Sequence, residues 1–392
     1  MTWTGSFEFL APARIVFGPG SAKRLGEIAR QLGRSAPLIL TDPGLHRLGI
    51  TETVETSLRE AGLRVATSTD VTTEPTLAAI KAAADAYRAH EADLLVAVGG
   101  GSTLDSSKAV SLILGNAGEF REYQERRVGN EWIPAKKVER RGTDLVTVPT
   151  TAGTGSETGR ASVITDETTH TKKVIFHPKM MPSIVIADPE LTVGLPARLT
   201  AGTGMDAFIH CFEAYCAPGY HPYAEGIAVE GMRLVKENLA RAVKDGRDIE
   251  ARGHMLAASQ MGSTAFQKGL GAIHSLSHPV GAVLDTHHGL TNAVAMPYVV
   301  KFNRAAIEEK VVRLARWLNL RVPTFDGFMQ WTLDLRREVG IPHTLAELGV
   351  KAEHLDKFSE MAAVDPTAGG NPIKVGAADM RKMYEAAVAG RL

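Results

Sequence analysis

The chain has 392 residues, of which 44% are apolar and 22% are charged, and its 44 basic residues balance 44 acidic ones. This composition excludes a disordered or fibrous protein and argues against the basic surface of a nucleic-acid or anionic-membrane binder. The sequence shows no signal-peptide pattern, no run near the ~20 apolar residues that span a bilayer, and only two cysteines, Cys211 and Cys216, so we expect a soluble cytoplasmic protein with a small-molecule partner.

The pattern of expected strands and helices along the chain predicts two domains of different fold class. Up to residue 190, short runs rich in Val, Ile and Leu alternate with helical stretches, and strands alternating with helices form a parallel sheet. The runs are APLILTD, LRVATSTDV, DLLVAVGGG, DLVTVPTT and PSIVIADPE. Helical periodicity then dominates at 197–217, 224–243, 248–266, 303–318 and 376–390. We therefore predict an α/β domain over 1–190 and an all-α domain over 191–392.

A candidate nucleotide site follows the strand LLVAV. Gly99, Gly100, Gly101 and Ser102 lead into a helix, whose free N–H groups and positive dipole end suit a pyrophosphate, although an ordinary tight turn has the same composition. Upstream, Asp42 ends the strand LILTD, where a carboxylate can bind a ribose 2′-hydroxyl and repel a 2′-phosphate, which favours NAD over NADP. Because the acid precedes the glycines, the sheet connectivity must differ from that of the usual GxGxxG fingerprint.

A second loop, PTTAGTGSE at 149–157, also follows a predicted strand and is dense in hydroxyl-bearing and small residues. A solvated turn often has this composition. However, the loop and the glycine turn would both lie at carboxyl ends of strands in one sheet. The loop is therefore a second candidate for lining the cofactor.

The C-terminal half carries a cluster of metal-ligating residue types. Asp206 and His210 are four apart in a predicted helix, so their side chains lie on one face, and His274 and His278 repeat this spacing. His288 follows fourteen residues after His274. A lone histidine on an apolar helix is more often a hydrogen-bonded core residue. One carboxylate with three imidazoles suits Fe²⁺ or Zn²⁺ and leaves a coordination position for Lewis-acid chemistry.

Several motifs are similar to those of the iron-dependent (group III) alcohol dehydrogenase family, namely GGGSTLDSSK at 99–108, PTTAGTGSE at 149–157, GMDAFIHCFEAY at 204–215, and GAIHSLSHPVGA with HHGLTNAVAMP within 271–297. The resemblance runs from ARIVFGPGS at 13–21 to DPTAGGNP at 365–372. It implies an N-terminal dinucleotide-binding domain and a C-terminal metal-binding, catalytic domain of the dehydroquinate synthase-like fold. It also implies a homodimer or a higher homo-oligomer.

The resemblance assigns roles residue by residue. It implies that Asp206, His210, His274 and His288 bind Fe²⁺, or Zn²⁺ or another divalent ion in its place, and that His278 is a catalytic proton-relay or substrate-contacting residue. It assigns Asp42 to the adenosine ribose, the glycine turn to the pyrophosphate and the hydroxyl-rich loop to the nicotinamide side. The cofactor-binding set is Asp42, Gly99, Gly100, Gly101, Ser102, Asp105, Thr150, Thr151, Thr154 and Lys173.

Three departures, at Glu74, Ala161 and Ile373, limit what the resemblance carries over, and Ile373 stands where Arg is common, which puts in doubt a polar contact made from that end. Glu74 stands where the family usually has Asn, which would change a cofactor contact, and Ala161 stands where a bulky residue is common, which would widen the substrate pocket. Lys268, six residues before His274, would receive an anionic substrate group if it faces the site, although a lysine is more often exposed to solvent.

We therefore expect hydride transfer between NAD and a small primary alcohol or aldehyde, including one with an anionic group such as an ω-hydroxy acid. A metal-dependent lyase or cyclase of the dehydroquinate synthase type is one alternative, but it needs several basic residues. Metal-free reduction of the maleylacetate type is another, against which the intact Asp and His set argues. A non-enzymatic nucleotide-binding or filament subunit is the third.

Overall fold

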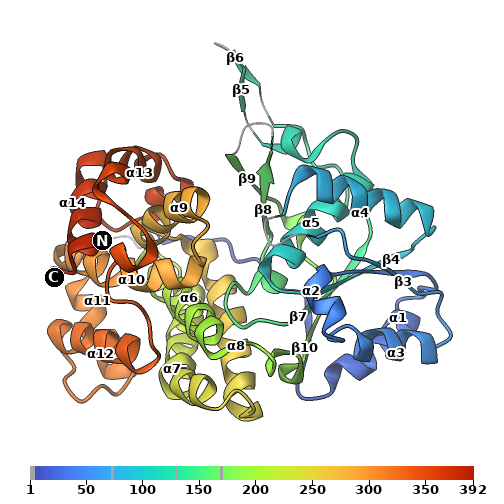
Figure 1. The fold of residues 1–392 in the computed structure, drawn as a ribbon, viewed down its shortest axis with the longest axis horizontal. Helices are drawn as coiled ribbons and strands as arrows, with labels where there is room; N and C mark the ends of the chain where they lie inside the picture. The colour runs from blue at the N-terminus through green and yellow to red at the C-terminus, as the bar shows by residue number, and fades with distance from the viewer. Residues whose placement is uncertain (1–4, 72–74, 125, 129–130, 134, 168–170) are drawn as a thin grey trace. The chain divides into compact units, whose positions relative to one another are not determined.

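The computed structural model describes residues 5–71, 75–124, 126–128, 131–133, 135–167 and 171–392, so Glu74 lies outside the described residues. The chain forms two compact units, drawn in Figure 1. The sheet unit comprises Leu10–Thr151 and Ser156–Thr192, and the helical unit comprises Val193–Leu392, Ala152–Gly155 and the N-terminal segment as far as Phe9. The sequence pattern did not predict that Ala152–Gly155 and the N-terminal segment pack with the helices.

A parallel six-stranded sheet forms the centre of the sheet unit, with the strand order β1-β10-β7-β4-β2-β3. Its strands are β1 (Arg14–Phe17), β2 (Pro37–Leu40), β3 (Ala66–Ser68), β4 (Leu94–Gly99), β7 (Asp144–Pro149) and β10 (Ile184–Ala187). β2, β4 and β10 are buried along their whole length, which is why they are continuous apolar runs instead of alternating ones. All but β1 are strands that the sequence predicted.

Helices cover both faces of this sheet (Figure 1). Alternate residues of β4 point to opposite faces, so that Leu95 packs in one core with Ile80 and Val96 packs in the other with Ile28. The first core involves α4 (Leu77–Ala89) and α5 (Gly101–Gly115), and the second involves α1 (Leu25–Gln31) and α3 (Glu52–Glu60). The remaining elements are α2 (Pro43–Arg47) and the antiparallel pairs β5 (Arg126–Val128) with β6 (Glu131–Ile133) and β8 (Ala161–Asp166) with β9 (Thr171–Phe176).

Helix α6 (Ala197–Cys216) is central to the helical unit. It is buried from Thr200 to Cys216 at nearly every position and contacts α7, α8 and α10, so this stretch has no face exposed to solvent. The surrounding helices are α7 (Pro222–Lys244), α8 (Ile249–Ala265), α9 (Ala272–Leu284), α10 (His288–Phe302), α11 (Arg304–Trp317), α12 (Phe325–Glu338), α13 (Leu355–Ala363) and α14 (Ala377–Ala389). The predicted fold class, a parallel α/β domain followed by a helical domain, is confirmed.

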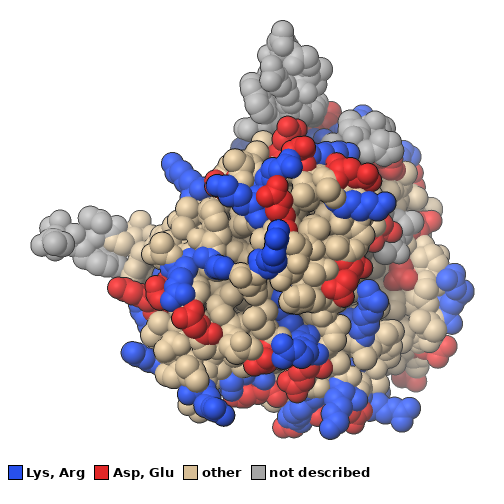
Figure 2. Space-filling model, turned by 60° about the vertical axis from the view of Figure 1, so that its left-hand side comes forward, with Lys and Arg blue, Asp and Glu red and all other residues tan. Residues whose placement is uncertain are grey.

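Within the described part of the chain, no helix combines the length and the apolar character needed to cross a membrane. On the face seen in Figure 2, basic and acidic side chains are interspersed.

Candidate metal and cofactor sites

The structure brings the four predicted metal ligands together in the helical unit. Asp206 and His210 lie on α6, His274 on α9 and His288 at the start of α10. Their potential ligand atoms all lie within 4.8 Å of one another. The Asp206 Oδ1 atom is 3.9 Å from His210 Nε2, 3.7 Å from His274 Nε2 and 3.5 Å from His288 Nε2. Residues up to 82 positions apart in the chain thus share one small volume.

Two glycines allow the helices that carry these residues to approach. A Cβ atom on Gly289 would lie 2.2 Å from the carbonyl oxygen of Gly202, so α10 begins directly against the α6 backbone. On α8, a Cβ atom on Gly262 would lie 2.9 Å from the Cβ of His210. A larger residue at either position would displace a candidate ligand.

Burial and charge set the protonation of the cluster. Burial opposes ionisation of Asp206, but the imidazoles of His210, His288 and His274 outweigh it and lower the pKa of this carboxyl. Burial lowers the pKa of both His210 and His288. His210 is almost fully buried, whereas His288 keeps 39% of its side chain exposed. For His274 burial acts in the same direction, but Glu213 raises its pKa. Neutral imidazoles at His210 and His288 present lone pairs for a cation.

The donor set fits a divalent metal ion. The Asn292 Nδ2 atom lies 2.8 Å from Asp206 Oδ1, 3.0 Å from His288 Nε2 and 3.2 Å from His274 Nε2, so three acceptors converge on an amide with only two hydrogens. Among the described residues, no lysine or arginine pairs with the buried Asp206. Ligands at ~2.1 Å from a tetrahedral ion are about 3.4 Å apart. The observed separations of 3.5–3.9 Å from Asp206 Oδ1 are close to this value.

His278 lies one turn beyond His274, outside the set of four, and has a carboxylate partner. Its Nδ1 atom is 2.8 Å from Asp365 Oδ2, and its ring stacks on His288 with centroids 5.4 Å apart. The other Asp365 oxygen accepts hydrogen bonds from Thr367 N at 2.9 Å and Thr367 Oγ1 at 2.5 Å. Burial opposes ionisation of Asp365, but His278 outweighs it and lowers the pKa of this carboxyl. The sequence analysis missed Asp365, which lies in the DPTAGGNP motif.

The predicted cofactor residues of the sheet unit gather at the carboxyl ends of neighbouring strands. Asp42 follows β2, Gly99 ends β4, and α5 begins at Gly101. The chain leaves β2 for β3 on one side while β4 pairs with β2 on the other, so the two sites flank the topological switch point, where α/β sheets bind ligands. Thr150 follows β7 and donates its N–H to the Gly99 carbonyl at 3.0 Å. Thr151 is the next residue.

The other predicted cofactor contacts have different settings. Asp42 Oδ1 caps α2 by accepting hydrogen bonds from Gly44 N and Leu45 N at 2.8 and 3.0 Å. The Asp105 carboxylate accepts hydrogen bonds from Val163 N at 2.9 Å and from Ser156 Oγ, and it pairs with Lys108 at 3.0 Å. Its role as a cofactor contact stays a prediction, and these bonds tie α5 to the β8 strand.

Lys173 lies on β9 opposite Ile164, within the β8–β9 hairpin. Thr154 belongs to the short segment Ala152–Gly155 that packs in the helical unit, where a Cβ atom on Gly153 would lie 2.6 Å from Thr203 Cβ.

Two family models match nearly the whole chain. Iron-containing alcohol dehydrogenase matches residues 12–189, and the C-terminal model of the Fe-containing alcohol dehydrogenase family matches residues 200–388. The chain belongs to the iron-containing alcohol dehydrogenase family. It is therefore an oxidoreductase, and the family resemblance seen in the sequence is confirmed.

Its relatives in this family cover it almost completely. The chain is 39% identical over 376 residues to the 4-hydroxybutyrate dehydrogenase of Cupriavidus necator, covering 93% of this chain and 96% of that one. It is 38% identical to the NAD-dependent methanol dehydrogenase of Bacillus methanolicus, with coverage of 93% and 95%. A solved structure of 1,3-propanediol oxidoreductase superposes with a TM-score of 0.91 at 33% identity, covering 97% of this chain and 100% of that one.

Lys268 does not have the position that the sequence suggested for an anion-binding residue. Its side chain is only 2% exposed, and its Nζ atom lies 2.7 Å from Glu225 Oε1 and 3.2 Å from the Tyr215 carbonyl oxygen. Lys310 binds the same two acceptors at 2.9 Å. Burial lowers the pKa of Lys268 although Glu225 acts to raise it. Lys268 is thus part of an internal ion pair with Glu225.

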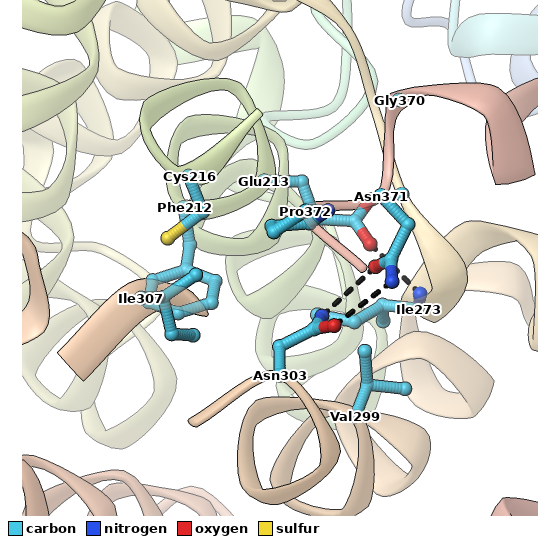
Figure 3. Close-up of a pocket in the computed structure, with 11 residues that line it drawn as sticks. Phe212, Glu213, Cys216, Ile273, Val299, Asn303, Ile307, Gly370, Asn371 and Pro372 are labelled. Atoms are coloured by element: carbon cyan, nitrogen blue, oxygen red, sulfur yellow. Dashed lines mark hydrogen bonds between the residues drawn. The ribbon is translucent and has the colours of Figure 1, made fainter. Parts of the chain in front are cut away.

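Two further polar residues that the sequence analysis missed lie beside the start of α9. Glu213 is 2.6 Å from His274 Nδ1, and Asn371 accepts a hydrogen bond from Ala272 N at 3.2 Å and exchanges two amide hydrogen bonds of 2.8 Å with Asn303. Figure 3 shows these residues around a small cavity. The cavity is lined by Phe212, Glu213, Cys216, Gly271, Ile273, Val299, Asn303, Ile307, Gly370, Asn371 and Pro372.

Proposed function

We propose that this chain transfers a hydride between NAD and a small primary alcohol or its aldehyde, with a divalent ion, in the first instance Fe²⁺, held by Asp206, His210, His274 and His288. One observation carries the proposal. A buried carboxylate and three imidazoles, all from the helical unit, place their ligand atoms within 4.8 Å of one another. Buried charge is costly unless it is paired or binds a metal, and among the described residues this carboxylate has imidazoles and an amide as partners and no lysine or arginine.

When bound, the divalent ion would supply Lewis-acid chemistry toward the substrate oxygen, and the nicotinamide would supply the hydride acceptor or donor. The protein supplies the setting. Asp206 contributes the single negative charge of the ligand set, and neutral imidazoles at His210 and His288 contribute lone pairs. With these four protein ligands, a bound ion would keep a coordination position for a substrate oxygen.

The sheet unit is proposed to bind the dinucleotide. Asp42, at the carboxyl end of β2, would accept a hydrogen bond from the ribose 2′-hydroxyl and would repel a 2′-phosphate. The N-terminus of α5, which begins at Gly101 and carries the positive end of the helix dipole, would bind the pyrophosphate. The nicotinamide side is assigned to Thr150, Thr151, Thr154 and Lys173.

His278 is proposed to carry the proton that the hydroxyl group loses. The Asp365 carboxylate only accepts hydrogen bonds, so the Nδ1 atom of His278 carries a hydrogen and the Nε2 atom is left to accept or return a proton. Thr367 binds the second oxygen of Asp365 and so keeps the first one directed at the imidazole.

The substrate class rests on relatives whose names specify small primary alcohols, namely 4-hydroxybutyrate, methanol and 1,3-propanediol. We include ω-hydroxy acids on the strength of the first of these. Lys268 is not assigned to their carboxylate because it is paired with Glu225. We also propose a homodimer or a higher homo-oligomer.

The test is NADH formation by protein reconstituted anaerobically with Fe²⁺, using methanol, 1-butanol, 1,3-propanediol and 4-hydroxybutyrate. We expect turnover with NAD, at least about tenfold less with NADP, and its loss in His274→Ala. His278→Ala should lose about 100-fold in kcat with an unchanged metal content. His254→Ala, on α8 of the same unit and outside the cluster, is the matched control and should retain activity. Absence of turnover in both directions with both cofactors would refute the proposal.

A further inference from the structure

We propose that Glu213 is a positioning residue that determines which ring nitrogen His274 offers to the metal ion. The inference rests on the proposed function, because that function makes His274 a metal ligand. It gives a role to a residue that lies in the motif at 204–215 but is not one of the four proposed ligands.

Glu213 is placed for this role by the spacing of α6. It follows Asp206 by seven residues and His210 by three, so all three side chains lie along one face of the helix. The Glu213 side chain is 5% exposed. Its Oε2 atom is 2.6 Å from His274 Nδ1, and its Oε1 atom accepts a hydrogen bond from the Ile273 N–H at 2.7 Å. Both carboxylate oxygens are therefore bound to consecutive residues of the first turn of α9.

This arrangement selects one tautomer of His274. A carboxylate can only accept hydrogen bonds, so the Nδ1 atom must carry a hydrogen. In a neutral imidazole the Nε2 atom then has the free lone pair, and this atom is the one 3.7 Å from Asp206 Oδ1. A carboxylate bonded to the remote nitrogen of a metal-binding histidine fixes both the tautomer and the ring orientation, and it makes the histidine a stronger ligand.

The start of α9 depends on the same contact. No side chain caps this helix at Gly271, and its first N–H groups are bound instead by residues from elsewhere in the chain. Glu213 accepts from Ile273 N, and Asn371, held by its amide pair with Asn303, accepts from Ala272 N (Figure 3). A negative charge is also favourable at a helix N-terminus. The first turn of α9, which carries His274, is thus held in place by these hydrogen bonds.

The substitution Glu213→Gln separates positioning from packing. Glutamine keeps the shape but has one acceptor oxygen, whereas Ile273 N–H and His274 Nδ1–H both need an acceptor. If the glutamine oxygen binds Ile273 N–H, its amide group faces Nδ1, which must then be unprotonated. The hydrogen moves to Nε2 and blocks the lone pair that the ion requires.

The experiment measures two quantities on metal-free protein: the Kd for Zn²⁺, by competition with a chromophoric chelator, and the protonated nitrogen of His274, by NMR of ¹⁵N-histidine side chains. For Glu213→Gln we expect Kd to rise about 10- to 100-fold and the His274 hydrogen to move from Nδ1 to Nε2. Glu213→Asp keeps the charge with a shorter reach and should give an intermediate Kd.

Glu225→Gln is the matched control, since Glu225 is also a carboxylate that links helices of the same unit, but through Lys268 and Lys310. It should change Tm without changing Kd or the tautomer. A Glu213→Gln protein that is folded by circular dichroism, with a Kd within about twofold of wild type and Nδ1 still protonated, would overturn the inference. If wild type binds no Zn²⁺, the proposed function fails, while the tautomer measurement still decides the role of Glu213 because it needs no metal.

Discussion

The metal cluster of the helical unit and the nucleotide edge of the sheet unit are built by different means. The cluster consists of side-chain atoms of Asp206, His210, His274 and His288, which three helices bring together. The nucleotide edge offers mostly backbone, because Gly99 and Gly100 have no side chain and α5 presents its first N–H groups. The metal cluster should therefore lose metal binding when a side chain is removed, and the nucleotide edge should lose cofactor binding when a side-chain atom is added.

The two sites also differ in charge. Asp206 is buried and has imidazoles and one amide as its neighbours, an arrangement that favours a cation. The N-terminus of α5 is the positive end of a helix dipole, which favours an anion. Variants of the four metal ligands should therefore leave NADH binding unchanged, and variants of Gly99 or Asp42 should leave metal binding unchanged. The predictions below are ordered from the largest expected effect to the smallest.

Asp206→Asn should have the largest effect. It removes the negative charge of the ligand set while keeping the shape of the side chain. We expect kcat/KM to fall by about a thousandfold, equivalent to about 4 kcal/mol of transition-state stabilisation. NADH binding, measured by fluorescence titration, should be unchanged. A parallel loss of NADH affinity would contradict the independence of the two sites.

Gly99→Ala should act on the other site. The added Cβ atom would lie 2.4 Å from Thr103 Oγ1 and 2.6 Å from Thr103 Cβ, so the first turn of α5 must shift. Overpacking of this kind costs about 1–3 kcal/mol, and we expect the Kd for NADH to rise about tenfold or more with an unchanged metal content. Gly226→Ala, where the added atom meets nothing within 4 Å, is the control and should leave both quantities unchanged.

Asp42→Asn should change cofactor preference without unfolding α2. Asparagine is as good a helix N-cap as aspartate, but it has no charge to repel a 2′-phosphate. The ratio of kcat/KM for NAD over NADP should fall about tenfold, equivalent to about 1.4 kcal/mol. Asp42→Ala should lose the same preference and also about 1 kcal/mol of stability with the cap. An unchanged ratio in both variants would remove Asp42 from the cofactor site.

We expect the smallest effect from a substitution of Asp144. This residue lies at the amino end of β7, and so at the edge of the sheet opposite to the nucleotide edge. Burial opposes its ionisation, but Arg34 at 2.5 Å and Ser183 at 2.9 Å outweigh it and lower the pKa of this carboxyl. A lowered folded-state pKa stabilises the protein above the unfolded value of about 3.9, and this contribution is lost as the pH falls through the folded-state pKa.

Because the Asp144 pair is partly exposed, Asp144→Asn should cost at most about 1 kcal/mol at pH 7. Urea unfolding should show this difference shrinking below about pH 4. Fe²⁺ and NADH binding should not change at any pH. A difference that grows in acid would show that the pKa is not lowered in the folded state.

Much of the fold could be predicted because the periodicity is local. Buried parallel strands such as β4 are continuous apolar runs, and long amphipathic helices such as α7 have a clear period. β1 was missed as a strand because only Val16 is buried in it. α9 and α10 were not among the predicted helices, and each contains an internal proline, Pro279 and Pro297, a residue that usually interrupts a helix.

The candidate site divides in the same way. The spacing of Asp206 and His210 reveals a shared helix face in the sequence, but the partners of the histidines are distant in the chain. Glu213 is 61 residues from His274, and Asp365 is 87 residues from His278. Sequence spacing carries no information on such pairs. The ion pair of Lys268 could not be predicted for the same reason, because its partner Glu225 is 43 residues away.

If four side chains of the helical unit hold one metal ion, each of them should be needed to bind it, and the iron content of purified protein measures this. Wild type and the alanine variants of Asp206, His210, His274 and His288 would be reconstituted anaerobically with Fe²⁺, desalted and analysed by mass spectrometry for iron per chain. We expect one ion per chain in wild type and little or none in each variant that remains folded. Iron retained at the wild-type ratio in all four variants, or none bound by wild type, would contradict this expectation.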